Sequence, residues 1–154
     1  MILGREDDYT NLTKEGNFKL HEVLDSEDKY QPSLQQVVNA IQLAQRLEVL
    51  RKSIGSIDIN SWFRSTWWNQ KVNGTITSFH LQGLAADIKF DFKPWTRYSL
   101  TKLFESIGFT NVNFYWNANH TSWVWIHVDI GKPWNGKEFY YRDMDAVTQK
   151  EITL

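Results

Sequence analysis

Residues 78–88 read SFHLQGLAADI, a tight turn that leads into the start of a strand. The small residues in this stretch allow the chain to turn closely, and the apolar and polar pattern of residues 85–90 is typical of a short strand. Such a turn can bring the side chains of His80 and Asp87 to one point. The elements on either side of this turn define the rest of the fold.

Two amphipathic helices are expected, one before the turn and one after it. The first covers residues 33–54, where Ser33 and Gln36 form a capping box and Gly55 ends the helix. The second covers residues 96–107 and ends before a glycine. Both carry an apolar stripe at helical spacing, and the stripe of the second helix is expected to pack on a sheet.

Short strands with alternating polarity are expected to form that sheet. They fall at residues 57–62, 85–90, 112–116 and 123–130. The polar residues 117–121 between the last two predict a hairpin loop. Helices and antiparallel strands in this order indicate an α+β fold, a small antiparallel sheet with helices packed on one side. We expect a flexible N-terminal arm over residues 1–16 and one domain over residues 17–154.

The composition limits the partners and the metal ligands that this protein can use. Seventeen Lys plus Arg against eighteen Asp plus Glu give a net charge of −1, which argues against nucleic acid as a partner. There is no cysteine, so a metal would need His, carboxylate or carbonyl ligands. No signal peptide or membrane span is predicted, and we expect synthesis in the cytoplasm. Most of the many aromatic residues should fill the core, whereas Trp67, Trp68 and Trp134 are expected to line a groove.

A second polar cluster lies in residues 125–129, which read WIHVD. Alternation along a strand puts Trp125, His127 and Asp129 on one face of it. Together with His80 and Asp87, His127 completes a set of two imidazoles and one carboxylate. Three such ligands are typical of a catalytic zinc site, because the fourth position stays open for water.

The surrounding sequence resembles a known family. Residues 61–65 (SWFRS), Asn69, Gly74, residues 78–88 and the WIHVD segment occur in order. They are similar to the signature Ser-x-Tyr-Arg-Ser, Asn, Gly, Ser-x-His-x-x-Gly-x-Ala-x-Asp and His-Val-Asp of the D-Ala-D-Ala carboxypeptidase and L-alanyl-D-glutamate endopeptidase family. The likeness extends over roughly residues 17–135, and its beginning resembles the phage and bacterial branch.

This resemblance implies a zinc-dependent peptidase that cleaves peptidoglycan stem peptides, with His80, Asp87 and His127 as the zinc ligands. It implies that Arg64 holds a substrate carboxylate or polarises the attacked carbonyl, as a planar guanidinium can. Ser78 and Gln82 are candidates for orienting the imidazoles. A phage-derived protein that acts at the cell wall or in a phage particle is expected.

One part of the family pattern is absent. Peptide-cleaving members carry a carboxylate as general base three residues before the closing His, where this chain has Val124, or further upstream, where it has Asn117. His120 in the expected hairpin loop is the candidate replacement, and Asp129 is a second one that better suits a supporting role. The alternative is a non-catalytic relative that keeps the fold and the metal, serves as a virion structural or wall-binding protein, and contacts virion partners.

Overall fold

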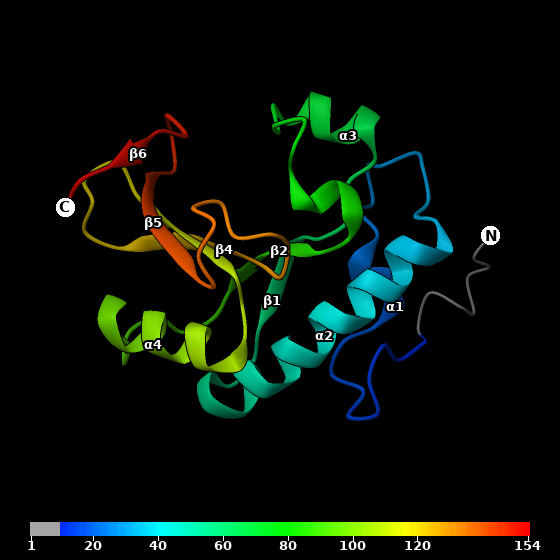
Figure 1. Ribbon diagram of the computed structural model, residues 1–154, viewed down its shortest axis with the longest axis horizontal. Coiled ribbons are helices and arrows are strands. Elements are labelled where there is room, and N and C mark those ends of the chain that lie inside the picture. The colour runs from blue at the N-terminus through cyan, green and yellow to red at the C-terminus, as the bar shows by residue number, and fades with distance from the viewer. Residues whose placement is uncertain (1–9) are drawn as a thin grey trace.

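The computed structural model describes residues 10–154, and Figure 1 shows an open sheet with helices on both of its sides. The helical elements are α1 (Leu20–Val23), α2 (Leu34–Ile54), α3 (Thr66–Lys71), the 3₁₀ turn η2 (Phe79–Gln82) and α4 (Arg97–Ile107). The strands are β1 (Asp58–Ser61), β2 (Ala85–Lys89), β3 (Asn111–Trp116), β4 (Trp123–Asp129), β5 (Tyr140–Asp145) and β6 (Glu151–Ile152). The fold is α+β in a single domain, as the sequence predicts.

The six strands form one sheet in the order β1-β2-β4-β3-β5-β6. All neighbours are antiparallel except β3 and β5, which run parallel. The predicted hairpin of β3 and β4 is confirmed, with Asn113 opposite His127. Asp87 of β2 lies opposite the same histidine on its other side. The centre of the sheet therefore carries the predicted site residues.

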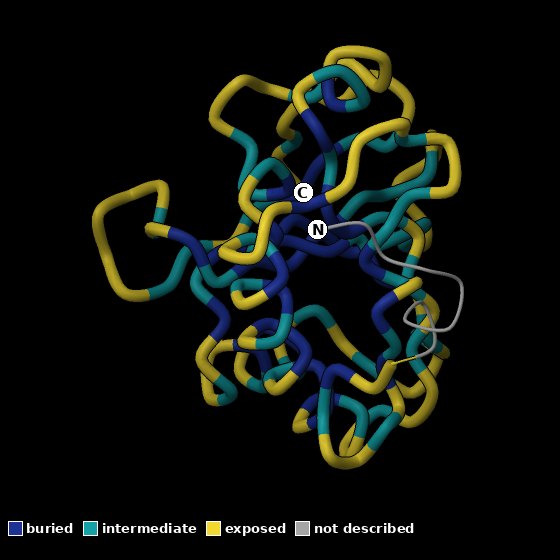
Figure 2. Tube along the Cα trace, turned by 90° about the vertical axis from the view of Figure 1, so that its right-hand side faces the viewer, coloured by how far each residue is buried: buried dark blue, intermediate teal, exposed yellow. Residues whose placement is uncertain are grey.

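Helices α2 and α4 begin and end where the sequence predicts. Ser33 Oγ accepts a hydrogen bond from the Gln36 backbone N–H, and the Gln36 side chain accepts one from Ser33 N–H at 2.7 Å. Thr96 caps α4 in the same way. Both helices cover one face of the sheet, where fully buried side chains such as Phe104 and Ile126 form the core. In Figure 2 the buried parts of the chain run through the interior, and the exposed parts lie mostly in the outer loops.

The structure adds elements that the sequence pattern does not reveal. Helix α3 has six residues, too few to display an apolar period, and lies on the side of the sheet opposite α2. Strands β5 and β6 come from the C-terminal stretch, which has no regular alternation. Residues 130–139 lead from the end of β4 past the start of β3. Asn111 of β3 holds this connection in place: its Nδ2 donates to Lys132 O, and its Oδ1 accepts from Trp134 N–H. This connection allows β5 to join the sheet beside β3.

The expected N-terminal arm falls partly on residues 1–9, which lie outside the described residues. In the described part, Leu12 is buried in the core and Thr13 Oγ1 donates to Glu48 Oε1 of α2 at 2.6 Å. The boundary at residue 17 stays a prediction. Among the helices of residues 10–154, none is long and apolar enough to cross a membrane.

Candidate metal centre

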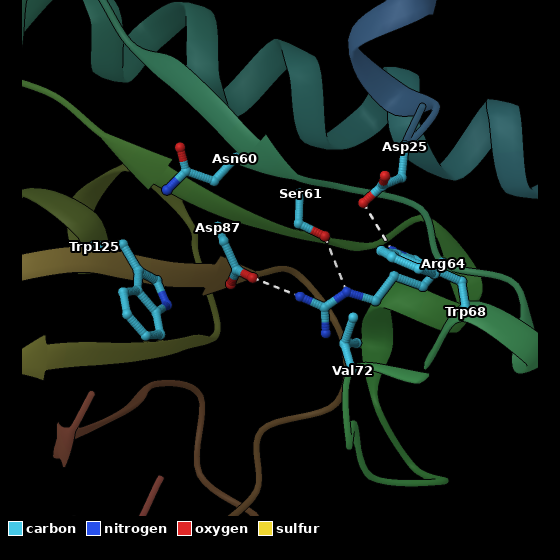
Figure 3. A pocket seen from close by; sticks show the side chains of 8 residues that line it. All are labelled: Asp25, Asn60, Ser61, Arg64, Trp68, Val72, Asp87 and Trp125. Carbon is cyan, nitrogen blue, oxygen red and sulfur yellow. Dashed lines mark hydrogen bonds and ion pairs between the residues drawn. The ribbon is translucent and has the colours of Figure 1, made fainter. Parts of the chain in front are cut away.

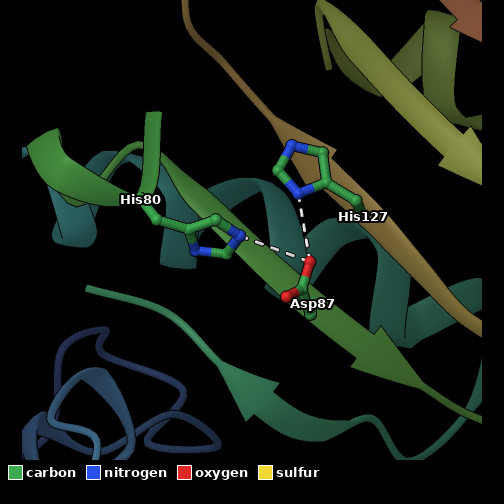
Figure 4. A group of neighbouring side chains, drawn as sticks. All are labelled: His80, Asp87 and His127. Carbon is green, nitrogen blue, oxygen red and sulfur yellow. Dashed lines mark hydrogen bonds and ion pairs between the residues drawn. The ribbon is translucent and has the colours of Figure 1, made fainter. Parts of the chain in front are cut away.

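Three side chains from three different elements converge on the face of the sheet opposite α2 and α4. His80 comes from η2, Asp87 from β2 and His127 from β4, and one ligand atom from each lies within 4.8 Å of the others (Figure 4). Asp87 Oδ1 lies 3.3 Å from His80 Nε2 and 3.0 Å from His127 Nδ1. The three side chains therefore lie together, and their role as metal ligands stays a prediction.

Local backbone geometry explains why His80 reaches the two strand residues. Gly83 ends the 3₁₀ turn with φ of 74°, a conformation that favours glycine. A Cβ at this position would lie 2.5 Å from the backbone oxygen of Gln36 in α2. The chain thus turns sharply against α2 and enters β2, so that His80 and Asp87 face each other.

The ring of His80 is oriented by the backbone. Its Nδ1 lies 2.5 Å from the carbonyl oxygen of Trp62, and the side chain is buried. A carbonyl can only accept, so Nδ1 donates to it, and Nε2 is the ring nitrogen that faces Asp87. The sequence hypothesis assigned this orienting role to Ser78 and Gln82. The contact to a backbone atom of a distant residue leaves no mark in the sequence.

The ring of His127 lies between two carboxylates. Nδ1 faces Asp87 and Nε2 lies 3.0 Å from Asp129 Oδ2. Asp129 is fully buried, and its Oδ1 accepts hydrogen bonds from Asn111 Nδ2 at 2.7 Å and Gly131 N at 3.1 Å. The fixed carboxylate of Asp129 therefore sets the orientation of the ring and leaves Nδ1 directed at the cluster.

The pKa values of the three groups reflect this arrangement. Burial lowers the pKa of His80, although Asp87 opposes this effect. Burial also works against a charged His127 ring, but the carboxylates of Asp129 and Asp87 outweigh it and raise the pKa of His127 to about 9. Burial would raise the pKa of Asp87, yet His80 and His127 hold it well below its usual value. A metal at this point would have to displace the proton from His127.

Arg64 lies directly beside the cluster. Its Nη2 donates to Asp87 Oδ2 at 2.7 Å and its Nε donates to Ser61 Oγ at 2.9 Å (Figure 3). The side chain is 15% exposed and lines a small cavity of about 230 Å³ together with Trp68 and Trp125. Two anchored nitrogens fix the guanidinium while Nη1 remains available for another acceptor.

A larger cavity of about 1000 Å³ lies over the cluster. Its lining includes Arg64, all three cluster residues and side chains from β3, β4 and β5. Trp134 lines this cavity and Trp68 lines the smaller one, as a groove would require. Trp67 is not among the residues that line either cavity and instead contacts Tyr30 and two lysines. The space is large enough for several residues of an extended peptide.

The structure does not bring His120 to the cluster. His120 has a positive φ of 53° in the β3–β4 loop, its Nε2 lies 3.0 Å from Asp145 Oδ2, and it is not among the residues lining either cavity. The pKa of Asp145 is lowered to about 2, chiefly by the Thr148 backbone N–H and then by His120. His120 therefore has a role in this loop that needs no substrate.

The structure also places Val124 and Asn117, the two positions at which the family carries its general-base carboxylate. Val124 is left unpaired at an irregularity of β4, because Tyr115 lies opposite Trp125 and Trp116 lies opposite Trp123. The Asn117 side chain is used within its own loop, where Nδ2 donates to the hydroxyl groups of Thr121 and Ser122.

Replacing Asp129 with asparagine should weaken zinc binding about 10- to 100-fold, the usual effect of losing a carboxylate partner of a ligating histidine. The amide keeps the size of the side chain but accepts more weakly from His127 Nε2–H. Competition with a chelator of known affinity measures the change. Thr110→Val is the control, since Thr110 contacts Asp129 Oδ1 and not the oxygen that faces His127. Equal affinities of Asp129→Asn and the parent protein would exclude the orienting role.

A family model described as peptidase M15 matches residues 16–129, a span that contains Arg64 and all three residues of the cluster. No curated protein matches the chain.

Proposed function

The chain belongs to the peptidase M15 family, a family of zinc peptidases, and we propose that it hydrolyses peptide bonds in peptidoglycan stem peptides with a zinc ion held by His80, Asp87 and His127. The observation that carries this proposal is the convergence of these side chains within 4.8 Å under a large cavity. Family membership supports the peptidoglycan substrate. The proposal extends to a phage origin and to action at the cell wall.

The donor atoms fit zinc. Two imidazole nitrogens and a carboxylate oxygen are ligands that zinc prefers, and three protein ligands leave a position open. Each imidazole has its other nitrogen engaged, by the Trp62 carbonyl for His80 and by Asp129 for His127. Such partners are typical of ligating histidines, because they fix the ring and strengthen the ligand.

Bound zinc would lower the pKa of a water toward about 7 and polarise the peptide carbonyl. The chain's own part is to bind and orient the substrate. Asp87 and Ser61 hold Nη2 and Nε of Arg64, so that Nη1 can hold the carbonyl oxygen or a carboxylate of the peptide. Stacked rings of Tyr115 and Trp125, with centroids 4.4 Å apart, form part of the cavity wall along which an extended peptide can lie.

A second candidate function is favoured because Val124 and Asn117 occupy the two positions where the family carries its general-base carboxylate. Among the described residues that line the large cavity, the carboxylates are those of Asp87, which faces both histidines, and of Glu151, whose side chain is 56% exposed. With His120 engaged by Asp145, this supports a relative that binds zinc and wall peptides without cleaving them. Such a protein would act as a wall-binding or virion structural component.

Release of soluble muropeptides from purified walls separates the two functions. We expect the zinc-loaded parent protein to release muropeptides and the chelator-treated protein to release none until zinc is restored. If His120 is the base, His120→Ala should lower turnover about 10²-fold or more at unchanged zinc content. An active parent protein that is indifferent to His120→Ala would exclude His120.

The same assay tests the non-catalytic alternative with Val124→Asp and Asn117→Glu. In a non-catalytic relative the parent protein should be silent, whereas a restored carboxylate should produce activity, because a general base typically contributes about 10²- to 10⁴-fold. Val124→Asp is the cleaner variant, since Asn117→Glu also removes the loop contacts of the amide. A silent parent protein with an active restored variant would overturn the peptidase proposal.

A further inference from the structure

A row of polar side chains crosses the sheet from the candidate metal centre to β5. Asp87 lies opposite His127, His127 opposite Asn113, and Asn113 opposite Arg142. Directly opposed residues on neighbouring strands point to the same face of a sheet. Arg142 therefore projects from the same face as the cluster, and it lines the same large cavity.

Arg142 is held in place at two points. Its Nε donates to Asn113 Oδ1 at 3.0 Å. Its guanidinium carbon lies 4.6 Å from the ring centroid of Trp134, a cation–π contact. The same indole also lies against the ring of His127, with centroids 6.0 Å apart and ring planes 20° apart. Trp134 thus links the position of Arg142 to that of the candidate zinc ligand.

The outer guanidinium nitrogens of Arg142 are available to bind another anion. Its ion pair in the structure is with Glu151, at a long distance of 3.9 Å from Nη1. The Glu151 side chain is 56% exposed, and pairs of this kind are weak because water screens them. A preorganised guanidinium with its outer nitrogens directed away from strong partners is suited to bidentate binding of a carboxylate.

Two arginines consequently flank the cluster on opposite sides. Arg64 contacts Asp87 of β2 and Ser61 of β1, whereas Arg142 lies two strands beyond His127 in the other direction. Neighbouring strands are about 4.8 Å apart, so the backbones of His127 and Arg142 are separated by roughly 10 Å. An extended peptide advances about 3.3–3.6 Å per residue, so this span corresponds to about three residues.

We propose that Arg142 is a specificity-determining residue that binds a second carboxylate of the peptide, two or three residues from the bond beside the zinc ligands. The inference rests on the proposed function for the kind of ligand, a stem peptide containing D-glutamate. The residue belongs to β5, beyond the span that the family model matches. The preference for an acidic peptide is thus a property of this chain's C-terminal strands.

Binding of a matched set of peptides tests the proposal without requiring cleavage. The probes are L-Ala-γ-D-Glu-L-Lys-D-Ala with both carboxyl groups free, with the D-glutamate α-carboxyl as the amide, and with the terminal carboxyl as the amide. Dissociation constants are measured by titration calorimetry on the zinc-loaded full chain. In the parent protein, one amidation should weaken binding about tenfold or more, the usual effect of losing a hydrogen bond to a charged group.

The Arg142→Met variant should bind the peptide with both carboxyl groups free about tenfold more weakly than the parent protein does. It should no longer distinguish this peptide from the amide that binds the parent protein more weakly. Arg142→Lys should retain part of the distinction, because it keeps the charge but not the fork. The matched control is Arg97→Met. Arg97 also contacts side chains of β5, namely Asp143 and Tyr141, but from the side of α4. The Arg97→Met variant should therefore distinguish the free acid from the amide as the parent protein does.

Three outcomes would overturn the inference: a parent protein that binds all three peptides equally, an Arg142→Met variant that still distinguishes them, or one that loses affinity equally for all three. Failure of the proposed function has a different signature. A parent protein that releases no muropeptides from walls, yet binds the free acid preferentially through Arg142, would refute hydrolysis and support the second carboxylate site.

Discussion

Replacing Asp87 with alanine is expected to abolish zinc binding and, with it, any hydrolysis. Asp87 Oδ1 is the atom that faces both histidines, so its loss leaves two imidazoles without the anionic ligand. Zinc at about 1,000 times its dissociation constant should stabilise the parent protein by about 4 kcal/mol. For a domain of this size, that corresponds to a rise in Tm on the order of 10 °C. The variant should show no such rise and no bound zinc by elemental analysis.

A matched control separates loss of the ligand from loss of a buried ion pair. Without metal, removing Asp87 takes away the carboxylate that pairs with Arg64 Nη2 and with His127 Nδ1, which can cost about 3–5 kcal/mol. Asp143→Ala breaks a comparable pair, because buried Asp143 accepts from Arg97 Nε at 2.8 Å on the opposite face of the sheet. That variant should lose stability but keep the zinc-dependent rise in Tm. One zinc per chain in Asp87→Ala would remove Asp87 from the ligand set.

Replacing Arg64 with methionine is expected to lower kcat/KM for peptide hydrolysis about 10²- to 10³-fold, the effect of losing one fixed electrostatic donor. Zinc content should be unchanged, because Arg64 contacts Asp87 Oδ2 and the histidines face Oδ1. Arg64→Lys should recover only part of the activity, since lysine lacks the planar fork. Steady-state kinetics on a synthetic stem peptide measure these values.

Arg51→Met is a suitable control for Arg64→Met. Arg51 lies in the last turn of α2 and is not among the residues that line either cavity, so its loss should leave kcat/KM unchanged. If Arg64→Met is as active as Arg51→Met, Arg64 has no part in binding or orienting the peptide. A parallel loss of zinc in Arg64→Met would instead indicate that the guanidinium holds Asp87 in its ligating position.

The sequence pointed to the candidate metal cluster through its resemblance to the family signature, because the spacing of the three residues is by itself only modestly specific. His80 and Asp87 are separated by a short turn of small residues, and His127 occupies the polar face of an alternating strand. The caps of α2 and α4 are equally local, since Ser33 and Thr96 bond to residues three positions further on. Local signals of this kind depend on chain neighbours and therefore survive in the sequence alone.

Strand β5 was not predicted, and the reason lies in Asp143. A strand with one face on the core should show apolar residues at alternate positions, but this core position carries a carboxylate. The structure neutralises it with Arg97 from α4 and with Trp116 Nε1–H from β3. Both partners are distant in the sequence, so the alternation of β5 becomes apparent only when the three elements are packed together.

What the sequence alone determined about this protein is its α+β class, its two long helices, the β3–β4 hairpin and the residues of the candidate metal cluster. Only the tertiary structure decided that the Trp62 carbonyl orients His80, that His120 pairs with Asp145 away from the cluster, and that Arg142 joins the row of Asp87 and His127. Helix caps and strand alternation are set by residues close in the chain. Contacts to a carbonyl, a loop carboxylate or a neighbouring strand depend on which distant segments the packed sheet brings together.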